Sequence, residues 1–578
     1  MRPRTNFIII KNIIIRSTHG TSVGHIQIGQ QGKWTIVNDI DLKRNIAVPT
    51  YDAKQILTIM PGMLDSHVHG QGGMDFADVK QPEDVLVAAM ALGQTGLSYA
   101  LATLPSLDPN WCELCLLDDL PNIGTVPLFK QLPGSAKSTY LIVDNKLFYV
   151  DKIAETIQDI EVSPAIVATL KAKFNITDKN SSISRLSLTQ LKEIATLTNH
   201  QHVVRGLPVV LQAIETHMQN EKKSPTPGAT KILGVHLEGP FIAQNCKGAH
   251  DERVLQASVD YDSFLSILNY APSIKEWKMT LAPDLPGAVQ FMHDLLKHQD
   301  ELHAAGLSIK INAGHTNASP TFMDEFMSLG AAGVTHCGNA CKETQCRKTV
   351  QDQAPTSHVV NWVLKNKEKC PKGIELIVDG HHLSQSFVKL VTQTIGTEKI
   401  NLVTDALGPT GLADGRYMLG TLPIYKKGDV FYLADPMQTG EAYTNNPPTL
   451  AGGAAPLHAC AQRFVAWTAA EKNSTFDERM EKIYLSAIQN PKTSSLSENA
   501  ISNLDEQSNA VIFDEHGKLI LSLVNHAIIF LNESALIPLK EIEKTLSIPG
   551  YSLHAGGEKN VCASEENGIN QCKIDPMH

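Results

Sequence analysis

Residues 307–336, LSIKINAGHTNASPTFMDEFMSLGAAGVTH, contain one complete strand-and-helix unit and the beginning of another. The first residues alternate apolar and polar side chains, as a β-strand does, and this run ends at His315. Ser319 is a suitable N-cap, Pro320 is a suitable first helical residue, and the apolar stripe of the helix stops at Gly330. This stretch therefore predicts a β-strand, a helix and a second β-strand in immediate succession.

Several other short apolar runs along the chain also end in a histidine or a carboxylate. The six side chains found in this context are His67, His69, Glu238, His315, His336 and Asp405. Strands that alternate with helices form a parallel sheet, and the carboxyl ends of the strands in a closed barrel meet at one rim. The pattern therefore predicts a (β/α)8 barrel, of the TIM type, whose rim carries these six side chains.

The residue types at these strand ends are those of a catalytic metal site. Glu238, His315 and His336 supply the usual three protein ligands of a catalytic zinc ion and leave one position open for water. His67 and His69 are two residues apart in a strand, so they face the same way and can hold a second ion. A carboxylate such as Asp405 can take a proton from metal-activated water and pass it to a leaving amine. We therefore expect a hydrolase that uses a divalent metal, zinc by preference.

Further polar side chains lie in the loops that follow these strands. They are His250, Asn339, Arg347 and His382. A guanidinium suits a phosphate, and imidazoles suit a carbonyl or phosphate oxygen. Taken one at a time, each is equally compatible with a loop residue that faces solvent.

The two ends of the chain differ from its middle in their pattern of apolar and polar residues. Residues 1–60 alternate apolar and polar side chains around turns, and the same texture returns in residues 501–555, so we expect one small β-sandwich domain built from both ends. Residues 61–500 would form the barrel. Residues 107–230 fit the strand-and-helix scheme poorly and are predicted to be a large insertion or subdomain, and residues 556–578 a disordered tail.

The first residues superficially resemble a signal sequence. The apolar stretch is interrupted by Lys11 and Asn12 and has no small-residue cleavage site after it. It therefore predicts two β-strands, Phe7 to Ile10 and Asn12 to Ile15, instead of a leader.

Composition narrows the possible partners and location of the chain. A formal net charge of −10 over 578 residues gives no basic surface for nucleic acid. No apolar run is long enough to cross a bilayer, so we expect no membrane partner. Ten cysteines in a chain of this length are not a disulfide framework, which predicts a reducing, cytoplasmic location.

Short motifs near the strand ends resemble the amidohydrolase superfamily and, within it, the N-acetylglucosamine-6-phosphate deacetylase family. The resemblance covers residues 61–106 and about 231–530. It is carried by HLEGPF at 236–241, KGAHD at 247–251, TLAPD at 280–284, AGHTNA at 313–318, THCGNA at 335–340, VDGHH at 378–382 and VTDA at 403–406.

The resemblance implies a function and a role for each site residue. The chain would remove the N-acetyl group of N-acetylglucosamine 6-phosphate, in amino-sugar catabolism, to give glucosamine 6-phosphate and acetate. Glu238, His315 and His336 would hold the metal, Asp405 would be general base and acid, and His250 would contact the substrate carbonyl. The groups implied for the phosphate and sugar are His382, Arg347 and the backbone of Asn339 and Ala340. In the family that arginine reaches across a dimer interface, which implies a homodimer.

Two other functions stay open at this point. One is hydrolysis of a different amide, cyclic or peptidic, on the same scaffold. Such an enzyme would use a lysine near the fourth strand to bridge two metals, and we expect Glu238 at that place. The other is a sugar-phosphate sensor without catalysis, which would have no need of Asp405. The sequence around Arg347, CRKTV, departs from the family pattern and weakens its assignment to the phosphate.

Overall fold

The structure, a computed structural model, gives side chains for most of the chain and only short backbone strands between residues 108 and 206. The ranges described with side chains are 7–18, 20–29, 31–38, 50–107, 207–252, 254–341, 357–419, 422–433, 449–469 and 474–529. Arg347 and the predicted tail 556–578 lie outside the described residues.

Eight parallel strands form the central sheet, and they follow each other around it in chain order. They are β6 (Leu64–Val68), β9 (Tyr99–Leu104), β16 (Lys231–Glu238), β17 (Glu276–Leu281), β18 (Ser308–Ala313), β19 (Gly333–Val334), β20 (Gly373–Ile377) and β21 (Ile400–Val403). The first and last strands are also neighbours, because the Asp405 amide donates to the His67 carbonyl at 2.9 Å. The predicted (β/α)8 barrel is confirmed.

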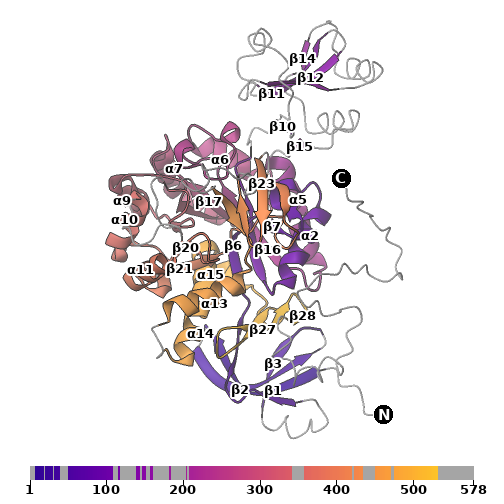
Figure 1. Cartoon of the computed structure of the whole chain (residues 1–578), viewed down its shortest axis with the longest axis vertical. Helices are drawn as coiled ribbons and strands as arrows, with labels where there is room; N and C mark the ends of the chain where they lie inside the picture. Colours follow the sequence, from indigo (N-terminus) through magenta and orange to yellow (C-terminus); the bar gives the residue numbers. More distant parts are fainter. Residues whose placement is uncertain are drawn as a thin grey trace, which may run out of the picture.

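The stretch 307–336 folds as its pattern predicts. Strand β18 is followed by helix α9 (Pro320–Ser328), whose N-cap Ser319 accepts a hydrogen bond from the Phe322 amide. Other helices that lie around the barrel in Figure 1 are α2 (Pro82–Gln94), α6 (Tyr261–Leu268), α7 (Ala288–Lys297), α10 (His358–Lys365), α11 (Gln385–Ile395) and α13 (Leu457–Thr468). Their apolar faces share one core with the outer faces of the strands.

Helix α5 (Leu207–Lys223) also belongs to the barrel wall. Its buried residues, among them Val210, Leu211 and Ile214, join the same core as helix α2. The helix lies within residues 107–230, the range expected to be an insertion, and its apolar face is buried against the barrel. Between β9 and α5, the described strands include one antiparallel sheet in the order β13 (Thr156–Ile160), β12 (Lys146–Asp151), β11 (Ser138–Val143), β14 (Ser181–Ile183).

Strands from both ends of the chain form one eight-stranded sheet, which Figure 1 shows next to the barrel. They are β1 (Phe7–Ser17), β2 (Gly20–Gly29), β3 (Trp34–Val37), β4 (Thr50–Asp52), β5 (Leu57–Pro61), β26 (Ala510–Asp514), β27 (Leu519–Val524) and β28 (Ala527–Phe530). The prediction of two strands before residue 16 is wrong. Phe7–Ser17 is a single strand whose register shifts between Ile10 and Ile13.

A smaller antiparallel sheet follows the last barrel strand. It consists of β22 (Gly415–Leu419), β23 (Leu422–Lys427), β24 (Val430–Tyr432) and β25 (Leu450–Gly453). Its apolar residues Leu419, Ile424 and Phe431 pack together with Leu407 from the loop after β21. This sheet therefore stands at the rim where the strands end. None of the helices in the described ranges is long and apolar enough to cross a membrane.

Candidate active site

Three predicted site residues leave their strands with an unusual backbone conformation. The φ angles are 47° at His315, 27° at His336 and 51° at Asp405. Residues other than glycine adopt positive φ rarely, and each such residue costs about 1–3 kcal/mol unless its surroundings compensate. Three such residues lie at the same rim of the barrel. The surrounding fold therefore imposes an unfavourable backbone conformation there, which sets the direction of each side chain.

Glu238, His315 and His336, called here the first ligand set, meet at the rim. The Oε1 atom of Glu238 lies 3.1 Å from Nε2 of His315 and 2.9 Å from Nε2 of His336. The two ring nitrogens are 3.0 Å apart. Ligands about 2.0–2.1 Å from a tetrahedral zinc ion would be about 3.3 Å from each other, so the triangle is close to that size.

The hydrogen bonding of His315 shows which of its two ring nitrogens can bind a metal ion. Its Nδ1 atom lies 2.9 Å from the carbonyl oxygen of Cys246, which can only accept. Nδ1 therefore carries a proton, and Nε2 is the nitrogen left to bind an ion. Two ring nitrogens that converge on one carboxylate oxygen are the donor set of a metal ion, so these residues fit a metal.

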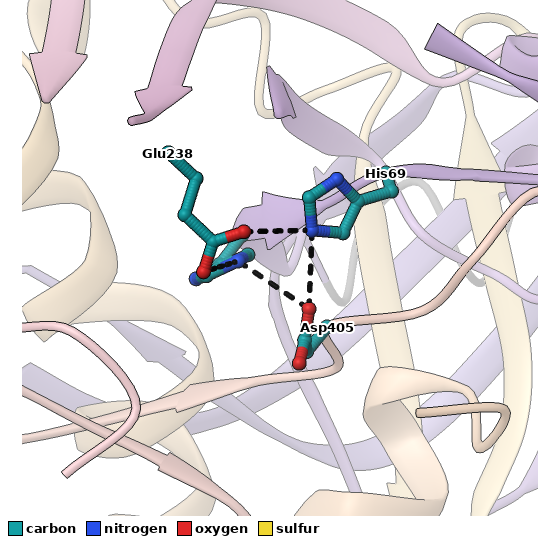
Figure 2. Close-up of side chains that lie close together, drawn as sticks. His69, Glu238 and Asp405 are labelled. Atoms are coloured by element: carbon teal, nitrogen blue, oxygen red, sulfur yellow. Dashed lines mark ion pairs between the residues drawn. The ribbon is translucent and has the colours of Figure 1, made fainter. Parts of the chain in front are cut away.

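His67, His69 and Asp405 form a second ligand set, which shares Glu238 with the first. Nε2 of His69 is 3.1 Å from Glu238 Oε2 and 3.2 Å from Asp405 Oδ1, and Figure 2 shows His69 between the two carboxylates. Nε2 of His67 is 3.2 Å from Glu238 Oε1 and 3.4 Å from Asp405 Oδ1. Donor atoms of all four residues lie within 4.8 Å of one another.

Two nitrogens in the second ligand set are buried without a hydrogen-bond partner, namely Nε2 of His67 and Nδ1 of His69. Buried polar atoms are seldom left in this state, because the loss of hydration is then uncompensated. For His67 the unpartnered nitrogen is the one that faces Glu238 and Asp405. The second set therefore also fits a cation.

The electrostatic environment keeps the two carboxylates charged. Burial alone would raise the pKa values of Glu238 and Asp405, but the imidazoles around them hold both below their usual range. In Glu238 the contribution of His67 is the largest of these favourable effects, and in Asp405 it is the hydrogen bond with His69. Two buried carboxylates that stay ionised in one site suit a divalent cation.

His250 points a proton into the site. The Ser106 amide donates to Nδ1 of His250 at 3.1 Å, so Nδ1 must be the unprotonated nitrogen. Burial lowers the pKa of His250 to about 4, so the ring is neutral and its proton is on Nε2. That atom lies 3.3 Å from Glu238 Oε2. A nitrogen that carries a proton cannot bind a metal, so His250 acts here as a hydrogen-bond donor.

His382 is oriented by the carboxylate three residues before it. Its Nδ1 lies 2.7 Å from Asp379 Oδ2, and the other oxygen of Asp379 accepts from the amides of His381 and His382. Burial would raise the pKa of Asp379, but the contact with His382 brings it to about 2.

One pocket collects most of the predicted residues. Those that line it are His69, Glu238, His250, His315, His336, Asn339, Ala340, His382 and Asp405. The sheet after the last barrel strand adds Leu419 and residues 449–452. His67 does not line the pocket, although it contacts Glu238 and Asp405. Of the predicted site residues, only Arg347 is not placed, because it lies outside the described residues.

Several residues that hold the site were not predicted as such. Ser106 fixes His250, Asp379 fixes His382, and Glu375 contacts His67 through Nδ1 at 3.4 Å. Glu375 carried a usable signal, since it is the single charged residue of the apolar strand β20. The expectation that Glu238 lies near the fourth strand is wrong. Glu238 ends the third barrel strand, and the fourth strand carries Lys278. Lys278 pairs with Glu375 in the barrel interior.

The chain is similar to known sugar-phosphate deacetylases, although no protein-family model matches it. It is 28% identical to N-acetylglucosamine-6-phosphate deacetylase of Mus musculus over 262 residues, which are 44% of this chain and 56% of the mouse protein. With N-acetylgalactosamine-6-phosphate deacetylase of Escherichia coli O157:H7 it shares 28% identity over 195 residues, or 33% and 45% of the two chains. The chain thus spans about half the length of the curated relatives it matches.

Solved structures of such enzymes share the fold. N-acetyl-D-glucosamine-6-phosphate deacetylase from Mycobacterium smegmatis superposes with a TM-score of 0.56 at 17% identity, over 90% of this chain and 100% of that one. The enzyme from Thermotoga maritima gives 0.54 at 19% identity, over 91% and 100%. These similarities confirm the resemblance that the motifs indicated, and they establish the fold.

Proposed function

We propose that this chain is a metal-dependent deacetylase that converts N-acetylglucosamine 6-phosphate and water into glucosamine 6-phosphate and acetate, a step of amino-sugar catabolism. The observation that carries the proposal is the convergence of both ligand sets on Glu238 beside His250, a neutral hydrogen-bond donor. The similarity to enzymes of that name supports the choice of substrate. A sensor without catalysis would need neither a donor aimed at a carbonyl nor a second carboxylate in the site.

The proposed metal is zinc. Glu238, His315 and His336 would hold one ion, and His67, His69, Asp405 and the shared Glu238 would hold a second. When bound, zinc polarises a carbonyl and lowers the pKa of water enough for attack near neutral pH. Imidazole and carboxylate ligands suit this ion.

The protein's own groups would then handle protons and charge. Asp405 would accept a proton from the attacking water while the water oxygen forms a bond to the acetyl carbon. The Nε2 proton of His250 would stabilise the negative charge that develops on the carbonyl oxygen. Asp405 would return the proton to the sugar nitrogen as the carbon–nitrogen bond breaks, and acetate and the free amine would leave.

The phosphate and sugar would be held by His382, the Asn339–Ala340 backbone and Arg347. His382 and Asn339 line the pocket, which supports this part. The proposal includes a homodimer in which Arg347 serves the partner's site, and a cytoplasmic location without nucleic-acid or membrane partners.

The test is acetate release by the purified, zinc-loaded protein. The substrates would be N-acetylglucosamine 6-phosphate, its galactose epimer and unphosphorylated N-acetylglucosamine. We expect the highest kcat/KM with the first of these. Tight binding of the sugar phosphate with no acetate released would favour the sensor, and hydrolysis of a dipeptide or cyclic amide alone would favour the other amide hydrolases.

Replacing His250 by alanine should lower kcat by about 10²-fold, the scale of removing one donor from an oxyanion site, and leave zinc content unchanged. The matched control is Ser106→Ala, which removes the hydroxyl 2.8 Å from Nδ1 but retains the backbone amide that donates to the same atom. It should stay close to wild-type turnover. Equal losses in the two variants would show that the tautomer argument is wrong.

Arg347→Ala should weaken binding of the phosphorylated sugar by roughly ten- to a hundredfold, since a charge-assisted hydrogen bond contributes about 1.5–3 kcal/mol. Activity on the unphosphorylated sugar should change little. Mixing Arg347→Ala chains with Asp405→Asn chains, under conditions where subunits exchange, should restore activity if the arginine serves the neighbouring site. No recovery would place Arg347 in its own chain's site or outside any site.

A further inference from the structure

A charged pair lies inside the barrel, next to the metal-ligand sets. Lys278 on β17 and Glu375 on β20 are 1% and 0% exposed, and their side chains form an ion pair. Barrel interiors are usually filled by branched apolar residues. Because two buried charges lose their hydration, such a pair contributes little to stability compared with an apolar pair of similar size. Its presence therefore calls for another explanation.

Glu375 uses its two carboxylate oxygens for different purposes. Oε1 accepts from Lys278 and, at 3.3 Å, from Nδ2 of Asn312. Oε2 lies 3.4 Å from Nδ1 of His67 and 3.3 Å from the amide nitrogen of His336. The carboxylate thus contacts one residue from each ligand set.

The contact with His67 decides the direction of that ring. A charged carboxylate only accepts, so Nδ1 of His67 carries a proton, and Nε2 is the ring nitrogen left to bind a cation beside Glu238 and Asp405. Lys278 adds to this, because its Nζ also bonds the carbonyl and hydroxyl oxygens of Ser66, at 3.3 Å and 3.2 Å, directly before His67. The orphaned Nε2 of His67 is the atom that this arrangement exposes to the site.

We propose that Glu375 and Lys278 are positioning residues that build a second divalent-cation site at His67, His69, Asp405 and Glu238. Glu375 fixes the tautomer and angle of His67, and Lys278 supplies the opposite charge that lets a carboxylate stand there. A carboxylate behind a metal-binding histidine commonly has this effect on the ligand. The inference rests on the metal chemistry of the proposed function, but its test does not use turnover.

The test is a zinc titration of metal-free protein against a competing chelator, with the bound ions counted by elemental analysis. The variant removes both charges at once, Lys278→Met with Glu375→Leu, so that no buried charge is left unpaired. We expect two ions in the wild type. In this apolar pair the second ion should bind about 10–100-fold more weakly, the usual effect of losing such a partner. The first ion should bind as before, because the Glu375 carbonyl still accepts from the Cys337 amide next to His336.

A second double variant separates positioning from simple packing. Lys278→Met with Glu375→Gln is also uncharged, but its amide oxygen can still accept from Nδ1 of His67. This variant should bind the second ion more tightly than the apolar pair does. The two variants should unfold at the same midpoint temperature. Asn312 donates to Oε1 of Glu375, the oxygen that does not face His67. Asn312→Ser should therefore leave the affinities for the first and second ions unchanged.

Three results would overturn the inference: a wild type that binds one ion only, an apolar pair that keeps the second ion at full affinity, or equal losses at both ions. If the apolar pair does not fold, a second uncharged pair that cannot accept from His67, Lys278→Leu with Glu375→Met, is titrated in the same way, and full affinity for the second ion in that variant also overturns the inference. Acetate release is measured separately, so a failure of the proposed deacetylase activity is distinguishable. A protein that binds two ions as described yet releases no acetate would reject the function and keep the positioning role.

Discussion

Replacing Glu238 by glutamine should remove bound zinc and turnover together. The two oxygens of Glu238 face His315 and His336 on one side and His69 on the other, so both ligand sets depend on this side chain. Glutamine has the same shape but no charge, and it offers only one oxygen. Because metal activation contributes several kcal/mol to the barrier, kcat/KM should fall roughly a thousandfold or more. Elemental analysis after exhaustive dialysis should find little zinc in the variant.

The chain offers a matched control for this prediction. Glu276 is another buried glutamate, at the start of the neighbouring strand β17, where it accepts from the hydroxyl and amide of Ser497 at 2.6 Å and 2.8 Å. Glu276→Gln should therefore alter stability and leave zinc content and turnover near wild type. Full zinc occupancy with normal turnover in Glu238→Gln would refute the assignment of both ligand sets.

The barrel could be predicted because its local signals agree with its tertiary structure. In residues 307–336 the alternation, the Ser319 cap and the Gly330 stop each indicate the same boundaries, and the strand and helix formed there. The same holds for 510–524, where the alternation expected in residues 501–555 forms the antiparallel strands β26 and β27. Closure of the barrel follows from the repeat of such units.

Where the prediction of the fold was wrong, distant contacts decide the structure. Strand β1 continues through Lys11 and Asn12 because Asn12 adopts a φ of 53° and its amide donates to Nδ1 of His25 at 3.1 Å. Neither feature is visible in the local pattern, which shows only two polar residues in an apolar run. Helix α5 was assigned to the insertion because residues 107–230 fit the strand-and-helix scheme poorly, although its apolar face packs in the barrel core.

The same division applies to the site. Residues at strand ends could be named from the sequence because a parallel barrel brings all carboxyl ends to one rim, whatever the order of the loops. Their supports could not, since Ser106, Glu375 and Asp379 matter only through the neighbours that the fold gives them. Glu375 stands on β20 and His67 on β6, and their contact depends on both strands facing the barrel interior.

Asp405→Asn should lower kcat by about 10²–10⁴-fold while the ion of the first ligand set stays bound. Asparagine occupies the same space, but it cannot accept the proton of the attacking water. Asp405 Oδ1 lies 3.2 Å from His69 and 3.4 Å from His67, so the variant should also weaken the second ion. Asp414→Asn, at an exposed carboxylate in the following loop, is the control and should keep wild-type turnover.

A change of leaving group separates the role of Asp405 as a proton carrier from its role as a ligand. An amide nitrogen must be protonated before it departs, whereas the phenolate of an activated ester such as p-nitrophenyl acetate leaves without a proton. If Asp405 carries that proton, the asparagine variant should lose much less activity on the ester than on the acetylated sugar phosphate. A residue that only holds metal would affect both substrates alike, since both carbonyls need the same polarisation. Equal losses on amide and ester, with zinc present in saturating amount, would therefore exclude Asp405 as the group that protonates the leaving amine.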